Sequence, residues 1–91
     1  MYKITQYSKD QALKLGVNIK PSTNHKKKID VFKKDKKIVS IGAINYDDYP
    51  TYIKKNGIKY ADDRRRLYKI RHKKDRSIVN TAGYYADKIL W

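Results

Sequence analysis

The chain has 91 residues, which suffices for one modest apolar core, and its 23 lysines and arginines against nine acidic residues give a formal net charge of +14 at pH 7. The absence of cysteine excludes disulfides and cysteine-ligated zinc, and no apolar run is long enough to span a bilayer. So large an excess of positive charge favours a polyanionic partner, which is DNA, RNA or an acidic membrane surface.

Short elements are predicted for the first 28 residues. Residues 8–15 begin with a serine that can cap a helix, and Gly16 follows as a helix stop. Residues 2–7 and 17–19 are predicted to form brief strands on either side of this helix. Residues 21–28, PSTNHKKK, contain turn formers and no apolar period, which predicts a mobile loop.

A β-hairpin is predicted next. The runs Ile29–Phe32 and Ile38–Ala43 are apolar and β-branched, and KKDKK separates them. The hairpin tip therefore carries four lysines that project into water: Lys33, Lys34, Lys36 and Lys37.

Helices are predicted for the rest of the chain. Residues 50–55 start with proline and end before an Asn-Gly pair, and a last helix after Thr81 runs to Leu90. Between them lies the longest predicted helix, residues 58–74, with an apolar stripe facing the core. That stripe consists of Tyr60, Leu67, Tyr68 and Ile70. The prediction is a single small α+β domain over residues 1–91, with an N-terminal helix and β-hairpin packed against two or three C-terminal helices.

The tract RRRLYKIRHKKDR divides into two groups of cations on a helical wheel. Arg64 and Arg71 fall inside the apolar sector, and we expect them to form structural ion pairs with Asp47 or Asp48. A recessed fork for phosphate or carboxylate is the alternative. The outward group could follow a phosphate backbone, because lysine-rich surfaces favour diffuse attraction over base reading. Its members are Arg65, Arg66, Lys69, Lys73, Lys74 and Arg76.

Nine tyrosines interleave with these charges. Tyr60, Tyr68 and Tyr85 are predicted to belong to the core, although exposed tyrosines can also serve as stacking platforms for unpaired bases. Both roles stay open for the remaining candidates, which are Tyr46, Tyr49 and Tyr52.

Catalytic and metal-binding signals are weak. Asp47-Asp48 and Asp62-Asp63 could together hold Mg²⁺, but adjacent acids beside arginine-rich segments are more simply explained as ion-pair partners. His25 and His72 lack ligand spacing. The sequence therefore predicts a protein that is not an enzyme and that uses no metal or cofactor.

Three segments, IGAINYDDYPTYI, DRRRLYKIRHKKD and TAGYYADKILW, occur in an order that resembles a family of short, basic, uncharacterised proteins of nucleocytoplasmic large DNA viruses. The resemblance covers residues 38–91. It implies a viral protein, found in the viral factory or nucleus of the infected cell and in the virion interior, and it implies no catalytic activity. The matching positions are Gly42, Asp48, Tyr49, Arg65, Tyr68, Arg71, His72, Ala82, Gly83, Leu90 and Trp91.

We therefore expect a non-enzymatic viral nucleic-acid-binding protein that contacts phosphate backbones non-specifically, in genome compaction or packaging. The alternative is a virion structural protein, a minor capsid or cement protein whose basic face meets acidic capsid surfaces while Tyr84 and Trp91 dock on a neighbour. The apolar ending KILW is predicted to be docked on the fold. Nucleic-acid type, sequence specificity and oligomeric state stay open.

Overall fold

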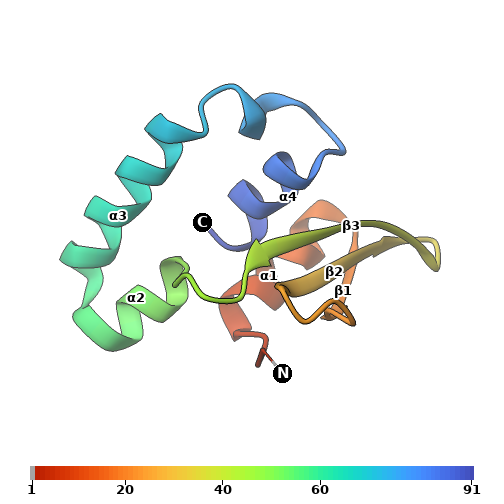
Figure 1. Ribbon diagram of the computed structural model, residues 1–91, viewed down its shortest axis with the longest axis horizontal. Coiled ribbons are helices and arrows are strands. Elements are labelled where there is room, and N and C mark those ends of the chain that lie inside the picture. The colour runs from red at the N-terminus through yellow and green to blue at the C-terminus, as the bar shows by residue number, and fades with distance from the viewer. Residues whose placement is uncertain (1) are drawn as a thin grey trace.

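A three-stranded antiparallel sheet, with its strands in sequence order, forms one end of the computed structural model, which describes residues 2–91 (Figure 1). The strands are β1 (Asn18–Pro21), β2 (Lys27–Lys33) and β3 (Lys36–Ala43). The helices are α1 (Gln6–Leu15), α2 (Tyr49–Asn56), α3 (Ile58–Arg71) and α4 (Ala82–Ile89), with a short 3-10 helix, η1 (Asp75–Ser77), before α4. The predicted α+β class and the order of helix, hairpin and C-terminal helices are confirmed.

The β2–β3 hairpin closes through a two-residue turn. Lys34 and Asp35 both have positive φ angles, 53° and 65°, between the paired residues Lys33 and Lys36. Two positive φ values match the right-handed twist of the flanking strands, which makes this turn a common hairpin connection. The predicted hairpin is therefore confirmed, and its lysine-rich tip lies at the far end of the molecule (Figure 1).

The apolar core lies between one face of this sheet and helices α1 and α4. Ile29, Val31 and Ile41 point inward from β2 and β3 and are at most 1% exposed. They meet Ile89 and Leu90 at the end of α4, which are as deeply buried. We call β1, β2, β3, α1 and α4 the body, because one contiguous cluster of apolar side chains holds them together.

The other two helices form what we call the arm, residues 49–72. Helix α2 leaves the end of the sheet, and α3 turns back beside it before η1 returns the chain to α4 (Figure 1). Asp48 caps α2 by accepting a hydrogen bond from the amide of Thr51 at 3.1 Å. Only Ala61 and Tyr68 are buried within α3. The arm therefore buries few of its side chains.

Three predicted boundaries are wrong. Helix α1 begins at Gln6 because Thr5 caps it, so residues 2–7 form no strand. The predicted loop 21–28 is shorter, because β1 includes Pro21 and β2 begins at Lys27. Helix α3 ends at Arg71 rather than at residue 74.

The predicted core-facing stripe of α3 is also wrong. Tyr68 is buried as expected, but Tyr60, Leu67 and Ile70 are 47%, 39% and 63% exposed. The apolar side chains of this small chain gather in the body, so too few remain to cover α3 on the side away from α2. Of the three tyrosines predicted to be core, Tyr68 and Tyr85 are buried and Tyr60 is not.

Candidate functional site

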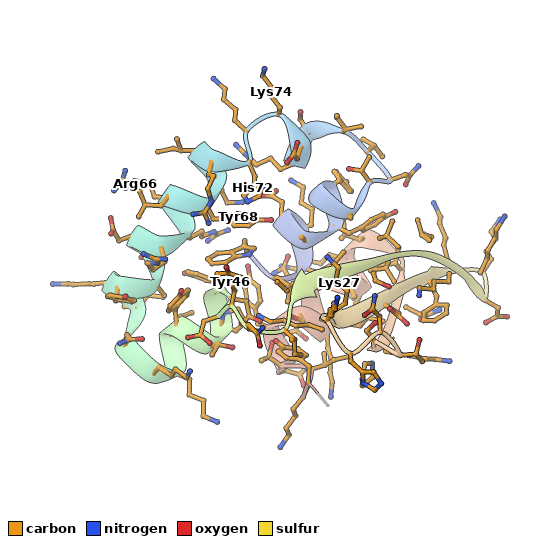
Figure 2. The ribbon with its side chains drawn as sticks, in the orientation of Figure 1. Lys27, Tyr46, Arg66, Tyr68, His72 and Lys74 are labelled. Carbon is orange, nitrogen blue, oxygen red and sulfur yellow. The ribbon has the colours of Figure 1, made fainter. Side chains whose placement is uncertain are left out.

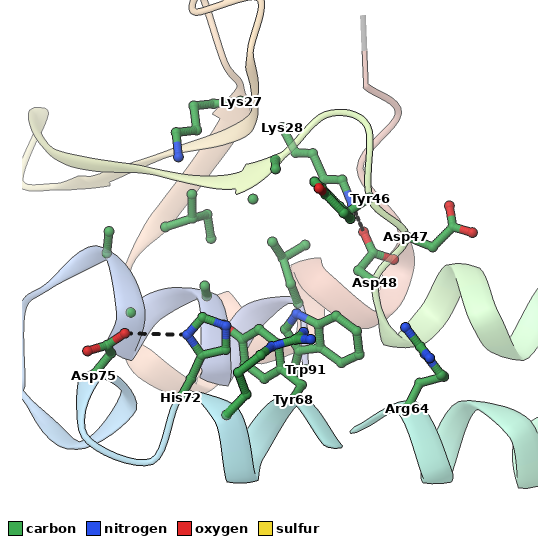
Figure 3. A pocket seen from close by; sticks show the side chains of 18 of the residues that line it. Lys27, Lys28, Tyr46, Asp47, Asp48, Arg64, Tyr68, His72, Asp75 and Trp91 are labelled. Atoms are coloured by element: carbon green, nitrogen blue, oxygen red, sulfur yellow. Dashed lines mark hydrogen bonds and ion pairs between the residues drawn. The ribbon is translucent and has the colours of Figure 1, made fainter. Parts of the chain in front are cut away.

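An open cleft of about 680 Å³ lies between the arm and the body. Lys27 and Tyr46 project from the wall formed by β2 and the segment after β3, and Tyr68 and His72 project from α3 on the opposite wall (Figure 3). Trp91 lies beside Tyr68. This volume falls in the range of about 300–1,000 Å³ that is usual for ligand sites.

Stacked aromatic rings line the α3 wall. The rings of Tyr68 and Trp91 lie 4.4 Å apart with planes only 10° from parallel, and Tyr68 also stacks on His72 at 4.4 Å. Tyr52 extends the column on the far side of Trp91 at 6.1 Å. Desolvation raises the pKa of Tyr68 to about 12, so its hydroxyl stays protonated. Tyr68 and Trp91 are therefore uncharged members of this column.

Asp48 is a fully occupied carboxylate at one end of the cleft. Its oxygens accept hydrogen bonds from Lys28 Nζ at 3.0 Å, the Tyr2 hydroxyl at 2.7 Å and the Thr51 hydroxyl at 2.6 Å. Desolvation raises the pKa of Asp48, but these hydrogen bonds and the charge of Lys28 have the larger effect, and the pKa lies below its usual value. Asp48 therefore joins the N-terminal segment, β2 and α2, and it has no free oxygen to offer a ligand.

The other two carboxylates of the cleft also have partners. Asp47 lies 3.3 Å from the ammonium group of Lys55, and Asp75 lies 3.4 Å from Nδ1 of His72. In residues 2–91, neither Asp47 nor Asp75 lies within 4 Å of an arginine of α3.

The predicted ion pairs of Arg64 and Arg71 with Asp47 or Asp48 are wrong, because those acids bind Lys55 and Lys28 instead. The Arg64 guanidinium lies over the ring of Tyr52, 5.5 Å from its centre, and Arg71 is exposed. Within residues 2–91, neither arginine has a carboxylate within 4 Å, and both line the cleft.

Half of the outward cations predicted on the longest helix are engaged inside the protein. Lys69 and Arg76 approach the buried carboxylate of Asp87 at 2.7 and 3.8 Å. The Arg65 guanidinium lies 4.7 Å from the centre of the Tyr49 ring. Lys69 joins the arm to α4, Arg76 joins η1 to α4, and Arg65 packs within the arm. Asp87 is a residue that sequence reasoning did not single out.

The other half of that group stays on the surface. Arg66 pairs with Asp63 at 2.8 Å, and its side chain remains 60% exposed. Lys73 and Lys74 are exposed, and neither has an acidic partner in the part of the chain that the structure describes. Arg66 and Lys74 point into solvent (Figure 2).

At the hairpin tip, the predicted exposure of the lysines is confirmed for all four. Lys37 lies 3.5 Å from Asp30, a buried carboxylate that also accepts hydrogen bonds from the hydroxyls of Ser22 and Ser40 at 2.6 Å. Desolvation raises the pKa of Asp30, but the two serines, the Thr23 amide and Lys37 outweigh it and lower the pKa to about 2. Asp30 is thus a structural group.

Most of the positive charge has no internal partner. Seven of the 23 lysines and arginines lie within 4 Å of a carboxylate in residues 2–91, which leaves 16 without one. Among the same residues, no group of three or more histidines and aspartates is arranged to hold a metal ion. None of their helices is both long enough and apolar enough to cross a membrane.

The fold and the cleft define a small basic α+β domain with an aromatic, cation-lined cleft. Residues 17–56 match a family of unknown function (DUF5754), a stretch that runs from the start of β1 to the end of α2. It contains the hairpin and the Lys28–Asp48 pair but neither α3 nor α4. Comparisons with curated proteins and with solved structures give no match.

The positions that carry the viral resemblance are scattered along the sequence but close in space. Nine of the eleven line the cleft, and the other two, Tyr49 and Arg65, stack on each other. Gly42 has a φ of +78°, and a Cβ there would lie 2.7 Å from a side-chain carbon of Leu90. A glycine is needed at that position because the strand passes so close to the end of α4.

Proposed function

We propose that the protein binds nucleic acid non-specifically through the phosphate backbone and performs no catalysis. The observation that carries this proposal is the set of 16 lysines and arginines without an acidic partner in residues 2–91. Such a surface gains free energy when phosphates replace the small anions around it and counterions leave the nucleic acid. In the viral setting that the resemblance implies, this activity would serve genome compaction or packaging.

The contact surface that we propose differs from the one read from the sequence. Arg65, Lys69 and Arg76 are engaged inside the protein, so they are removed from it. The remaining cations form two groups, one at the end of α3 and one at the hairpin tip. They are Arg66, Lys73 and Lys74 in the first group, and Lys33, Lys34, Lys36 and Lys37 in the second.

The alternative, a virion structural protein that docks on a capsid neighbour through Tyr84 and Trp91, loses one of its supports. Trp91 stacks on Tyr68 within the chain, and Tyr84 packs partly buried against the body core, so neither ring is free to dock elsewhere without rearrangement. We therefore keep nucleic acid as the partner.

The test is fluorescence anisotropy of labelled duplex DNA, single-stranded DNA and RNA across a range of salt. If about six phosphates are neutralised, the logarithm of the association constant for duplex DNA should fall against the logarithm of salt with a slope of about −5. A slope near zero on all three nucleic acids would refute the proposal.

A pair of matched variants locates the surface. Replacing Lys33, Lys34 and Lys36 with glutamine removes three tip charges, and replacing Lys3, Lys9 and Lys14 removes three exposed charges from the N-terminal segment and α1. The tip variant should weaken binding more and lower the salt slope by up to about 3, since each lost phosphate contact contributes about 0.9. Equal losses in the two variants would show that total charge matters and the tip does not.

A further inference from the structure

We propose that the cleft between the arm and the body receives one unpaired nucleotide of a single strand. Its base would stack on the exposed ring of Tyr46, beside the column of Tyr68 and Trp91, and its phosphates would meet Lys27, Arg64 and Arg71. This inference rests on the proposed nucleic-acid binding and adds to it a preferred form of the ligand.

The charge of the cleft is the first argument. Two of its three carboxylates are engaged by cations, Asp48 by Lys28 and Asp47 by Lys55, and the third, Asp75, lies 3.4 Å from the His72 ring. Three of its cations, which are Lys27, Arg64 and Arg71, have no carboxylate within 4 Å in the described chain, residues 2–91. Because these cations come from both walls, an anionic group that enters the cleft is attracted from two sides.

The aromatic surface is the second argument. Packing of the arm onto the body accounts for Tyr68, which is 8% exposed. It does not account for Tyr46, which is 73% exposed at the lip of the opposite wall (Figure 3). His72 and Trp91 cover the two faces of the Tyr68 ring, so the ring face that is open to a base is that of Tyr46. An exposed ring face beside cations is the combination that binds single strands, because every base has a flat face that stacks on it.

The geometry selects an unpaired nucleotide. The base of a duplex is held between its neighbours and cannot enter the cleft without being turned out of the stack, which costs energy. The free-energy cost of presenting a base to the cleft is much smaller for a single strand, whose bases are already unpaired. The body supplies one wall and α3 the other, so the site exists only while the arm is docked (Figure 3).

Trp91 provides a direct readout, because it is the only tryptophan of the chain and it lines the cleft. We would titrate the full-length protein with four probes: oligo-dT, oligo-U, an abasic DNA strand of the same length, and duplex DNA. Oligo-dT and oligo-U should quench Trp91 and should bind at least about fivefold more tightly than the abasic strand, which is the low end for one stacked base. A response to only one of the two oligonucleotides would identify DNA or RNA as the ligand.

Two variants of equal charge separate the cleft from the general surface. Arg64→Gln with Arg71→Gln removes two cleft cations, and Lys73→Gln with Lys74→Gln removes two exposed cations just beyond the end of α3. The cleft variant should lose most of the preference for oligo-dT over duplex, whereas the control should weaken both ligands alike. Circular dichroism would confirm that both variants fold.

The outcomes distinguish this inference from the proposal on which it rests. If all four probes bind with similar salt-dependent affinity and Trp91 emission stays constant, nucleic-acid binding stands and the cleft assignment is wrong. If no probe binds, both are wrong. If only the base-bearing single strands quench Trp91 in the unmodified protein, both stand.

Discussion

The body and the arm of this protein are stabilised by different kinds of contact. Ile29, Val31 and Ile89 in the body are fully buried within one apolar cluster. The arm buries few side chains, and ring stacking and ion pairs carry most of its attachment. A small, highly charged chain has too few apolar residues for two such clusters, so its apolar residues form a single core.

Three contacts join the arm to the body from different directions. The Lys28–Asp48 pair lies where α2 begins, the Lys69–Asp87 pair connects α3 to α4, and the Tyr68–Trp91 stack lies beside the cleft. Such polar and aromatic contacts fix position but leave space between the two parts. The cleft is a consequence of that arrangement, and each of the following predictions tests the difference between body and arm.

Deleting residues 89–91 should have the largest effect, because it acts on both parts at once. Ile89 and Leu90 are 0% and 1% exposed, and loss of each buried side chain costs about 2–5 kcal/mol. The sum is comparable to the whole stability of a small domain, about 5–15 kcal/mol. We expect no cooperative unfolding transition by circular dichroism at 25 °C or above.

The single substitution Trp91→Ala is the matched control for that deletion. It removes only the ring that stacks on Tyr68 and leaves the two buried aliphatic residues in place. This variant should keep a cooperative transition at a lower temperature. If the deletion melts at the unchanged temperature, the ending KILW does not belong to the core.

Asp87→Ala should have a smaller effect and should act mainly on the arm. It leaves Lys69 and Arg76 without their carboxylate, and the expected loss is about 2–3 kcal/mol. This loss is at or below the smallest value usual for breaking a buried ion pair, about 3 kcal/mol, because both cations are partly exposed and can reach water. Amide hydrogen exchange should accelerate in α3 more than in β2.

The exposed acid of the arm supplies the control for Asp87. Asp63 pairs with Arg66 on the surface, so Asp63→Ala should change the free energy of unfolding by less than about 1 kcal/mol. Equal acceleration of exchange in α3 and in β2 of Asp87→Ala would mean that body and arm unfold as one unit.

Local features of this fold were predictable from sequence, and those set by distant partners were not. The hairpin follows from two β-branched runs around KKDKK, and the cap of the last helix from Thr81. The partner of Asp48 is Lys28, 20 residues away, and nothing near Asp48 points to it. The prediction for α3 was wrong because periodicity shows that a helix has an apolar side, but it does not show whether other residues of the chain bury that side.

The site follows the same division. Exposure of the lysines at the hairpin tip was predictable, because a turn between strands lies at the surface. The cleft was not, since its walls come from β2, α3 and the last residue. Asp87 carries no special spacing in the sequence, and only the return of α4 against α3 shows why Lys69 is engaged.

Acid should have a smaller effect on the body than the deletion of residues 89–91. The pKa of Asp30 is about 2 in the folded chain against an ordinary value of 3.8, so its contribution is present above pH 3.8 and is lost as the pH falls toward 2. That contribution is roughly 2 kcal/mol, from 1.36 kcal/mol for each pKa unit. Asp48, whose pKa is also lowered, adds a loss of stability at the junction with the arm.

The variant Asp30→Asn isolates the part that belongs to the body. Between pH 6 and pH 2, the free energy of unfolding measured with urea should fall by roughly 2 kcal/mol less in this variant than in the unmodified chain. Parallel curves would mean that the serine hydroxyls and Lys37 stabilise the ionised carboxylate no better than water does, and the polar face of the sheet would then contribute nothing to the contrast between body and arm.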